Sequence, residues 1–246
     1  MTLTLDPDLD PALYPLAWLI GQWEGEGAAT VPVSPAVHHG ATAADGSADA
    51  QGPNEDDAPA TEGRRIEQQI SAEPTEDAAL RWHMRTWVLD APPPVPPTAA
   101  FANSPESEDA EGDDAQTGDD EAVEGAPERR LLLEETAYWR VTGPMPGQDL
   151  AAAAKAKPGT PEALVSYGLE VTVANTEGAM ELYAGEVRGP RIRLFSQGVG
   201  RTDRSPVFDS ASRMFGLVGG KLMWVVDRQV EGQEAQTYLS AELARA

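Results

Sequence analysis

The sequence Gly21-Gln-Trp-Glu-Gly-Glu-Gly27 has the alternation of a β-strand with one polar face. Successive side chains of a strand point to opposite faces, so Gln22, Glu24 and Glu26 share one face, and Trp23 lies among glycines on the other. Glycines at alternate positions permit sharp coiling of the strand or the close approach of another group. The stretch opens no helix and lacks the spacing of a phosphate-binding loop. It is predicted to be a first strand that closes a barrel, with direct ligand contact as the alternative.

The rest of the chain contains further short strand patterns separated by turn residues. Nine such segments follow the first: 63–71, 79–90, 130–141, 164–175, 178–188, 191–198, 210–218, 221–229 and 235–243. Gly219-Gly220 is a two-residue hairpin signal. Ten strands in meander order predict an all-β, ten-stranded antiparallel up-and-down barrel, closed so that it has no edge strand. Residues 11–20 are expected to add a short N-terminal helix at one end, and the barrel is wide enough to enclose a ligand.

Two acidic segments interrupt this pattern. Residues 34–62 contain six acidic residues and residues 91–128 contain eleven, with no Lys or Arg in either. Such segments cannot bury enough apolar area to offset the entropy of ordering, so both are predicted to be disordered loops, as is the stretch 145–162 with a turn of Ala-rich helix. Residues 11–246 are therefore predicted to form one domain. The acidic loops are interpreted as solvating; the alternative is that they bind protein partners, which the sequence does not identify.

Composition excludes several classes of function. The chain of 246 residues has no Cys, which excludes disulfides, thiol catalysis, Cys-ligated zinc and iron–sulfur clusters. A formal charge of −23 argues against binding nucleic acid or an anionic membrane. The N-terminal MTLTLDPDLD lacks the features of a signal peptide, so a cytoplasmic protein is expected. Glu134 and Glu135 are adjacent and face opposite sides of a strand, and no catalytic residue or metal site is predicted.

Several motifs are similar to those of one known family. Gly21, Trp23, Gly25 and Gly27 form a GxWxGxG motif that resembles the signature of the nitrobindin family. Further matching segments follow in the expected order: Arg85-Thr-Trp87, Glu134-Glu-Thr-Ala-Tyr-Trp-Arg140, Gly200-Arg-Thr202, Phe215-Gly-Leu-Val218 and Leu239-Ser-Ala-Glu-Leu243. The resemblance implies a barrel akin to fatty-acid-binding proteins. It also implies that haem-binding relatives hold ferric haem through one histidine of the last strand, bind nitric oxide and isomerise peroxynitrite to nitrate.

The same resemblance shows departures at the haem site. In the family the iron-ligating histidine precedes the Leu-x-Ala-x-Leu run, and here that position is Tyr238. Pro206 stands where haem-binding relatives tend to carry a lysine, and Thr30 is a weak match to a threonine that follows the first strand. The chain thus resembles ferric nitrobindin-like proteins that lack the iron ligand. No cofactor is expected, and the predicted function is a binding module for a small apolar or amphipathic molecule.

The alternative is a peroxynitrite-isomerising protein that holds haem b through the Tyr238 phenolate. Forming a phenolate at pH 7 costs about 4 kcal/mol before any ligation, because the phenol pKa is about 10. Simple alternation places Tyr238 opposite Leu239 and hence outward, whereas the resemblance places it in the cavity; a twisted strand near the barrel mouth would reconcile them. His38 and His39 are predicted to be exposed loop residues, and the orientation of His83 stays open.

Residues lining the barrel are also predicted. The aromatic and methionine side chains proposed to line it are Trp23, either Trp82 or Trp87, and Met84. The arginines at 191, 193, 201, 204 and 213 are interpreted as exterior charges, with one of them as a carboxylate anchor inside the barrel in the alternative interpretation.

Overall fold

A computed structural model describes residues 7–32, 61–89 and 129–246, which contain ten strands. Most of the two acidic segments, with His38 and His39, lies outside the described residues. The strands are β1 Gly21–Pro32, β2 Thr61–Pro74, β3 Leu80–Leu89, β4 Arg129–Pro144, β5 Ser166–Asn175, β6 Ala179–Arg188, β7 Arg191–Arg201, β8 Ser210–Val218, β9 Lys221–Gln229 and β10 Gln236–Arg245.

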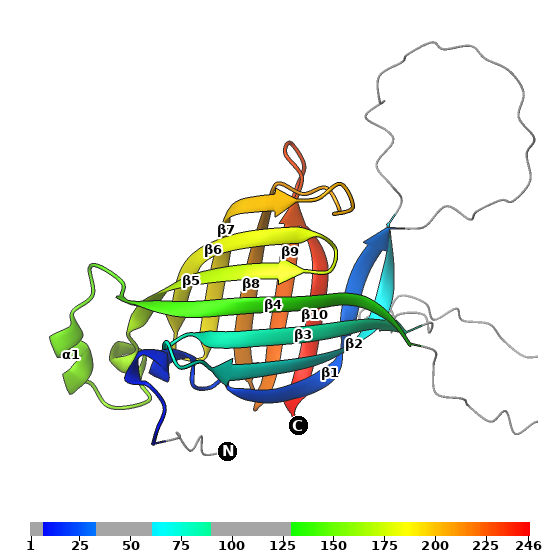
Figure 1. The fold of residues 1–246 in the computed structure, drawn as a ribbon. Coiled ribbons are helices and arrows are strands. Elements are labelled where there is room, and N and C mark those ends of the chain that lie inside the picture. Colours follow the sequence, from blue (N-terminus) through cyan, green and yellow to red (C-terminus); the bar gives the residue numbers. More distant parts are fainter. Residues whose placement is uncertain (1–6, 33–60, 90–128) are drawn as a thin grey trace, which may run out of the picture.

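The strands form a closed antiparallel barrel, as the sequence predicted. Each strand pairs with its neighbours in sequence, and β1 pairs with β10 to complete the ring. Figure 1 shows β1 beside β10 along the side of the barrel. The Gly219-Gly220 hairpin joins β8 to β9 with both glycines at positive φ, +60° and +84°, which is the conformation that a two-residue turn requires.

Close approach of the backbones explains the glycines of the first strand. A Cβ atom on Gly25 would lie 2.3 Å from the Glu242 carbonyl oxygen, and one on Gly27 would lie 2.0 Å from that of Ser240. Both carbonyls belong to β10. Trp23 points into the barrel, where it is 1% exposed and donates from Nε1 to the Leu19 carbonyl at 2.8 Å. The motif thus builds the seam of the barrel, as predicted.

A short 3-10 helix, η1 (Pro11–Leu16), packs at one end of the barrel. Leu13 and Leu16 of η1 are fully buried. The last strand ties this segment down, because Arg245 donates to the carbonyls of Ile20 and Trp18 at 2.5 and 3.0 Å. We call the opposite end the mouth; it carries the turn 175–178, the loop 202–209 and the turn 230–235, and β1 and β3 end there (Figure 1).

The segment 145–162 corrects one prediction. It contains a helix, α1 (Leu150–Lys155), whose N-terminus is capped by the Asp149 side chain, and a second short 3-10 helix, η3 (Pro161–Ala163), follows. Gln148 exchanges two hydrogen bonds with the backbone of Ser166, at 2.7 and 2.8 Å. The expected turn of helix is present, but the prediction of disorder is wrong here, since these contacts fix the segment. The first acidic segment also ends earlier than predicted, because β2 begins at Thr61.

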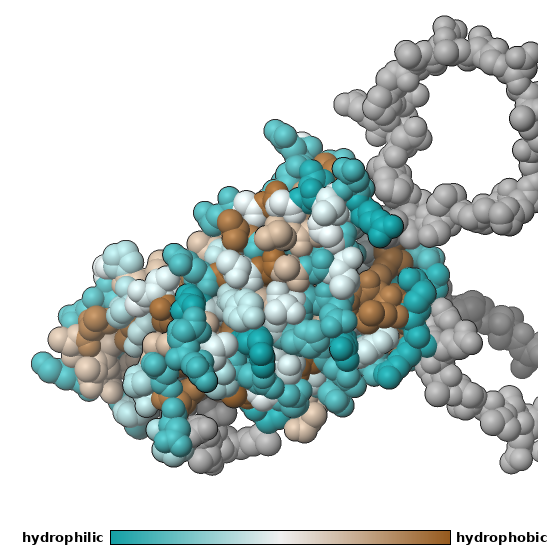
Figure 2. Space-filling model, in the orientation of Figure 1, coloured by the Kyte–Doolittle hydropathy of each residue, from teal (hydrophilic) through white to brown (hydrophobic). Residues whose placement is uncertain are grey.

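The outer surface is mostly polar. Figure 2 shows a largely hydrophilic face, with a compact hydrophobic patch toward the right of the view. Across the described ranges, no helix has the length and apolar character needed to cross a bilayer.

Candidate functional site

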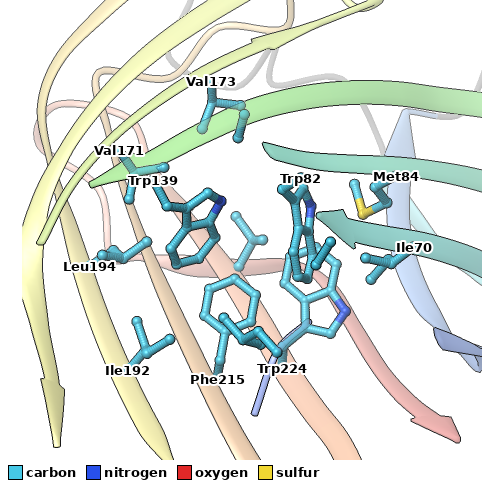
Figure 3. Close-up of a cluster of buried hydrophobic side chains, with 14 of the residues drawn as sticks. Ile70, Trp82, Met84, Trp139, Val171, Val173, Ile192, Leu194, Phe215 and Trp224 are labelled. Atoms are coloured by element: carbon cyan, nitrogen blue, oxygen red, sulfur yellow. The ribbon is translucent and has the colours of Figure 1, made fainter. Parts of the chain in front are cut away.

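Four aromatic rings fill the middle of the barrel. Trp82 of β3 and Trp139 of β4 lie 5.7 Å apart between ring centroids, and Phe215 of β8 stacks on Trp224 of β9 at 5.3 Å. Figure 3 shows these rings converging, with Met84 to one side. All four are at most 4% exposed, so they form a packed layer across the barrel. Trp82 and Met84 therefore face the interior, as predicted.

Above this layer, toward the mouth, Gln68 joins three strands. Its Nε2 donates to Thr86 Oγ1 at 2.9 Å, and its Oε1 accepts from Trp224 Nε1 at 3.1 Å. Gln68 and Thr86 are fully buried. A buried amide needs such partners, so this chain of hydrogen bonds fixes the orientation of the Trp224 ring.

A buried ionic network lies at the same depth. Arg213 of β8 donates from Nη1 and Nη2 to the two carboxylate oxygens of Glu135 at 2.6 and 2.8 Å, and from Nη2 to Glu181 at 3.3 Å. Its Nε donates to the Tyr183 hydroxyl, which itself donates to Glu181. Each side chain is at most 4% exposed. Each nitrogen of the Arg213 guanidinium thus donates a hydrogen bond to another side chain of the protein.

The charges of this network determine its protonation. Burial alone would lower the pKa of Arg213, but the facing Glu135 and Glu181 carboxylates hold that pKa well above its usual value. Burial raises the pKa of Tyr183, and the Glu181 charge raises it further, while Arg213 opposes them. A charged guanidinium and a neutral phenol therefore persist at neutral pH inside the barrel.

Tyr238 faces inward at the mouth, in contrast to simple alternation. The pairing of β10 with β9 shifts between Thr237 and Leu239, and this β-bulge lets Tyr238 pack on the core although Leu239 is also buried. The Tyr238 hydroxyl donates to Glu177 Oε1 at 2.6 Å. The guanidinium carbon of Arg228 lies 3.5 Å from the centroid of the Tyr238 ring.

Arg228 completes this cluster at the mouth. Its Nη2 donates to Glu177 Oε2 at 2.9 Å, and its guanidinium carbon also lies 4.3 Å from the Phe208 ring centroid. Burial and the Glu177 charge raise the pKa of Tyr238, and Arg228 opposes them. The local field therefore disfavours the phenolate form of Tyr238.

These contacts test whether the barrel offers an iron ligand to haem. A phenolate ligand would require Tyr238 to give up its proton, which now bonds Glu177, and to move out from beneath Arg228. His83 faces outward, with Nδ1 3.3 Å from Thr136 Oγ1 and Nε2 3.3 Å from Glu134 Oε1. As the structure places them, neither Tyr238 nor His83 is a free axial ligand for haem iron.

Other predicted site residues lie outside the barrel interior. Trp87 is half-buried on the outer face beneath Arg129, whose guanidinium carbon is 4.7 Å from its ring centroid, so of the two predicted alternatives Trp82 is the one that faces the interior. The Thr30 hydroxyl donates to the Thr237 carbonyl at 2.9 Å on the outer face. Glu134 and Glu135 face opposite sides, as predicted. Over the described ranges, no cluster of three His, Asp or Glu side chains could hold a metal.

The main prediction placed all five arginines on the exterior, and the structure places four of them there. Arg191, Arg193, Arg201 and Arg204 are exposed, whereas Arg213 is buried and binds carboxylates, although these belong to the protein itself. Sequence reasoning missed Arg228. Its signal was the alternation of β9, because Leu222, Trp224 and Val226 are the apolar residues of the inward face and Arg228 continues their register.

Comparisons with known proteins agree with this architecture. A family model described as the THAP4-like, haem-binding β-barrel domain matches residues 12–245. A ferric nitrobindin-like protein of Beutenbergia cavernae is 31% identical, over 100% of this chain and 99% of the relative. A peroxynitrite isomerase of Kocuria rhizophila is 25% identical, over 100% and 96%.

A solved structure supports the fold. The crystal structure of Rv2717c from M. tuberculosis superposes with a TM-score of 0.51 at 18% identity, covering 97% of this chain and 99% of that one. The GxWxGxG seam, the ten-stranded ring and the match over nearly the whole length agree, and the chain belongs to the nitrobindin-like family of haem-binding β-barrel domains.

Proposed function

We propose that this protein is a small-ligand-binding barrel that does not hold haem through an iron ligand of its own. The observation that carries the proposal is the engagement of Tyr238, whose hydroxyl donates to Glu177 while Arg228 covers its ring. Tyr238 stands at the position that the family resemblance assigns to the axial histidine. A phenol whose pKa is raised by burial and by a carboxylate is a poor source of phenolate for ferric iron.

The interior suits a small apolar or amphipathic molecule at the mouth. Inward-facing apolar side chains at that end come from several strands: Ala29, Val31, Ile66, Val88, Leu133, Val226 and Leu239. The Arg213 network lies between this region and the apolar surroundings deeper in the barrel. A large planar macrocycle that entered the barrel would contact the paired charges of this network. Displacing a buried ion pair leaves uncompensated charge, which is costly.

The alternative function follows from relatives named peroxynitrite isomerase. In that alternative Tyr238 ligates ferric haem. A haem titration read in the Soret region separates the two proposals, with Tyr238→Phe and the matched control Tyr138→Phe, an exposed tyrosine of β4. We expect no saturable one-to-one ferric spectrum in any of the three proteins. A saturable spectrum lost only in Tyr238→Phe would establish the alternative.

Ligand binding itself is read by tryptophan fluorescence, because Trp82, Trp139 and Trp224 lie inside the barrel. A panel of apolar and amphipathic molecules is expected to produce a saturable shift of emission. No shift with any member of a lipid, haem and porphyrin panel would contradict the proposal.

A further inference from the structure

The Arg228 guanidinium is held rigidly by aromatic rings and one carboxylate. Its carbon lies 3.5 Å from the Tyr238 ring centroid and 4.3 Å from that of Phe208, and Nη2 donates to Glu177 at 2.9 Å. The side chain is 10% exposed. Ring contacts engage the π-faces of a guanidinium and leave the N–H groups at its edges for hydrogen bonds.

Two of the Arg228 nitrogens have no hydrogen-bond acceptor among the residues that the structure describes. Arg228 Nε and Nη1 are buried and find no hydrogen-bond partner among the described residues, and neither does Asn175 Nδ2. The other end of the Asn175 amide is used, since Oδ1 accepts from the Ala179 amide at 3.1 Å. Asn175 begins the turn that carries Glu177, the partner of Arg228, so the three unpaired donor atoms lie at the mouth.

Unpaired buried donors indicate a missing acceptor. Buried N–H groups are nearly always hydrogen-bonded in folded proteins, because desolvating them without compensation is unfavourable. A ligand whose oxygen reached Arg228 and Asn175 would gain these hydrogen bonds without breaking an existing one.

The charges around the mouth decide which kind of acceptor fits. Arg213 and Arg228 carry two formal positive charges, and Glu135, Glu177 and Glu181 carry three negative ones. The two clusters are close enough for Glu181 to act electrostatically on both arginines. An anionic head group would add a fourth negative charge where water is scarce, and a cationic one would face donors. An uncharged oxygen acceptor avoids both penalties.

We propose that Arg228 and Asn175 form a site for the carbonyl oxygen of an uncharged apolar ligand, such as a ketone, ester or amide. The apolar part of the ligand packs on inward-facing residues of the mouth, among them Val226 and Leu239. This inference rests on the proposed function and adds the chemical class of the ligand.

Three probes of equal chain length test the inference: 2-decanone, decanoate and decylammonium. Tryptophan fluorescence gives their dissociation constants for the full-length protein. We expect 2-decanone to bind at least about tenfold more tightly than either charged probe. Tighter binding of decanoate would overturn the inference.

Variants test the two donor residues. In Arg228→Met/Glu177→Gln the guanidinium is removed without leaving a lone carboxylate, and Asn175→Asp removes the amide donor but keeps the acceptor for the Ala179 amide. Each is expected to weaken 2-decanone binding about tenfold or more. The control is Arg201→Met, because Arg201 is an exposed arginine at the mouth, where its Nη2 lies 3.6 Å from Asp209 Oδ1. The affinity of this control variant for 2-decanone should be unchanged.

The outcomes separate the two levels of the proposal. If Asn175→Asp and the double variant both bind 2-decanone as the unmodified protein does, the donors are satisfied by water and the inference is wrong, while the barrel remains a binding module. If no probe of this set or of the wider apolar panel changes the fluorescence, the proposed function itself fails. Far-UV circular dichroism identifies any variant that does not fold, and the remaining variant then decides.

Discussion

Tyr183 and Tyr238 are held as neutral phenols by their surroundings. Burial is the largest cause of both raised pKa values, and a neighbouring carboxylate adds to each: Glu181 for Tyr183 and Glu177 for Tyr238. In the unfolded chain both phenols titrate near pH 10. The folded protein therefore retains protons above pH 10 that the unfolded chain releases.

This difference predicts a loss of stability at alkaline pH. The stabilisation is fully present below about pH 10, and the free energy of unfolding should fall above it by up to about 1.4 kcal/mol per pH unit for each tyrosine. Urea denaturation at pH 9, 10 and 11 measures the fall, which should be smaller in Tyr183→Phe/Tyr238→Phe. The exposed pair Tyr14 and Tyr138 provides the control double variant. Equal pH profiles in all three proteins would contradict the prediction.

Arg213 forms ion pairs with two carboxylates that are almost fully buried. Arg213→Met leaves Glu135 and Glu181 buried without their guanidinium, so we expect a loss of about 3–5 kcal/mol in the free energy of unfolding. Arg81→Met is the control, because the Arg81–Glu73 pair is about half exposed and should contribute little to stability. Urea denaturation measures both.

A third variant identifies the cause of that loss. Arg213→Met with Glu135→Gln and Glu181→Gln removes the stranded charges together with the guanidinium. It should be more stable than Arg213→Met alone, because the penalty comes from uncompensated charge. A triple variant no more stable than the single one would mean that packing, not charge, sets the cost.

At the scale of elements, the β1–β10 pairing requires glycines in β1, because β10 leaves no room there for a side chain. A methyl group on Gly25 or Gly27 would meet a β10 backbone carbonyl, which cannot move aside as a flexible side chain can. Gly25→Ala and Gly27→Ala should each lower the free energy of unfolding by about 1–3 kcal/mol.

The matched control is Gly63→Ala in β2. Apart from its chain neighbours, no described residue has an atom within 4 Å of a Cβ built on Gly63, so this change should be neutral or slightly stabilising through the entropy of the unfolded chain. Thermal and urea denaturation of the three variants provide the comparison. Equal losses at all three positions would indicate a general intolerance of alanine in these strands instead of a crowded seam.

At the scale of the whole molecule, the barrel is predicted to fold without its acidic segments. Replacing 34–59 and 91–127 by four-residue turns shortens the β1–β2 and β3–β4 connections roughly five- to sevenfold. Loop closure then costs about 1.5 kcal/mol less for each connection, and removing like charges adds to the gain. The shortened protein should keep its far-UV spectrum and unfold at a higher urea concentration.

The same deletion tests whether those segments bind partners. If proteins captured by the full-length chain are also captured by the shortened chain, the acidic segments are solvating loops. Loss of a captured protein would assign them a binding function.

Strand patterns and turn residues were sufficient to predict the ring of strands. The alternation in each strand and the glycines of Gly21–Gly27 are local features of the sequence. Any pairing of the strands must place the apolar face of each strand inside and the glycines where backbones approach closely. Alternation separates Trp87 from Trp82 and Met84, because Trp87 shares a face with His83 and Arg85. It did not determine which of the two faces is inside; the structure buries Trp82 and Met84 and places Trp87 outside, where Arg129 covers its ring.

The sequence by itself determined the barrel and its closing strand, and it predicted that Tyr238 stands at the position of the family's axial histidine. Only the tertiary structure decided what Tyr238 does, because its partners Glu177 and Arg228 lie on other elements and a β-bulge turns it inward. The same holds for the buried Arg213 network, whose members come from β4, β6 and β8. Local patterns specify which face a side chain takes, whereas the partners of a buried charge depend on which strands face each other across the barrel.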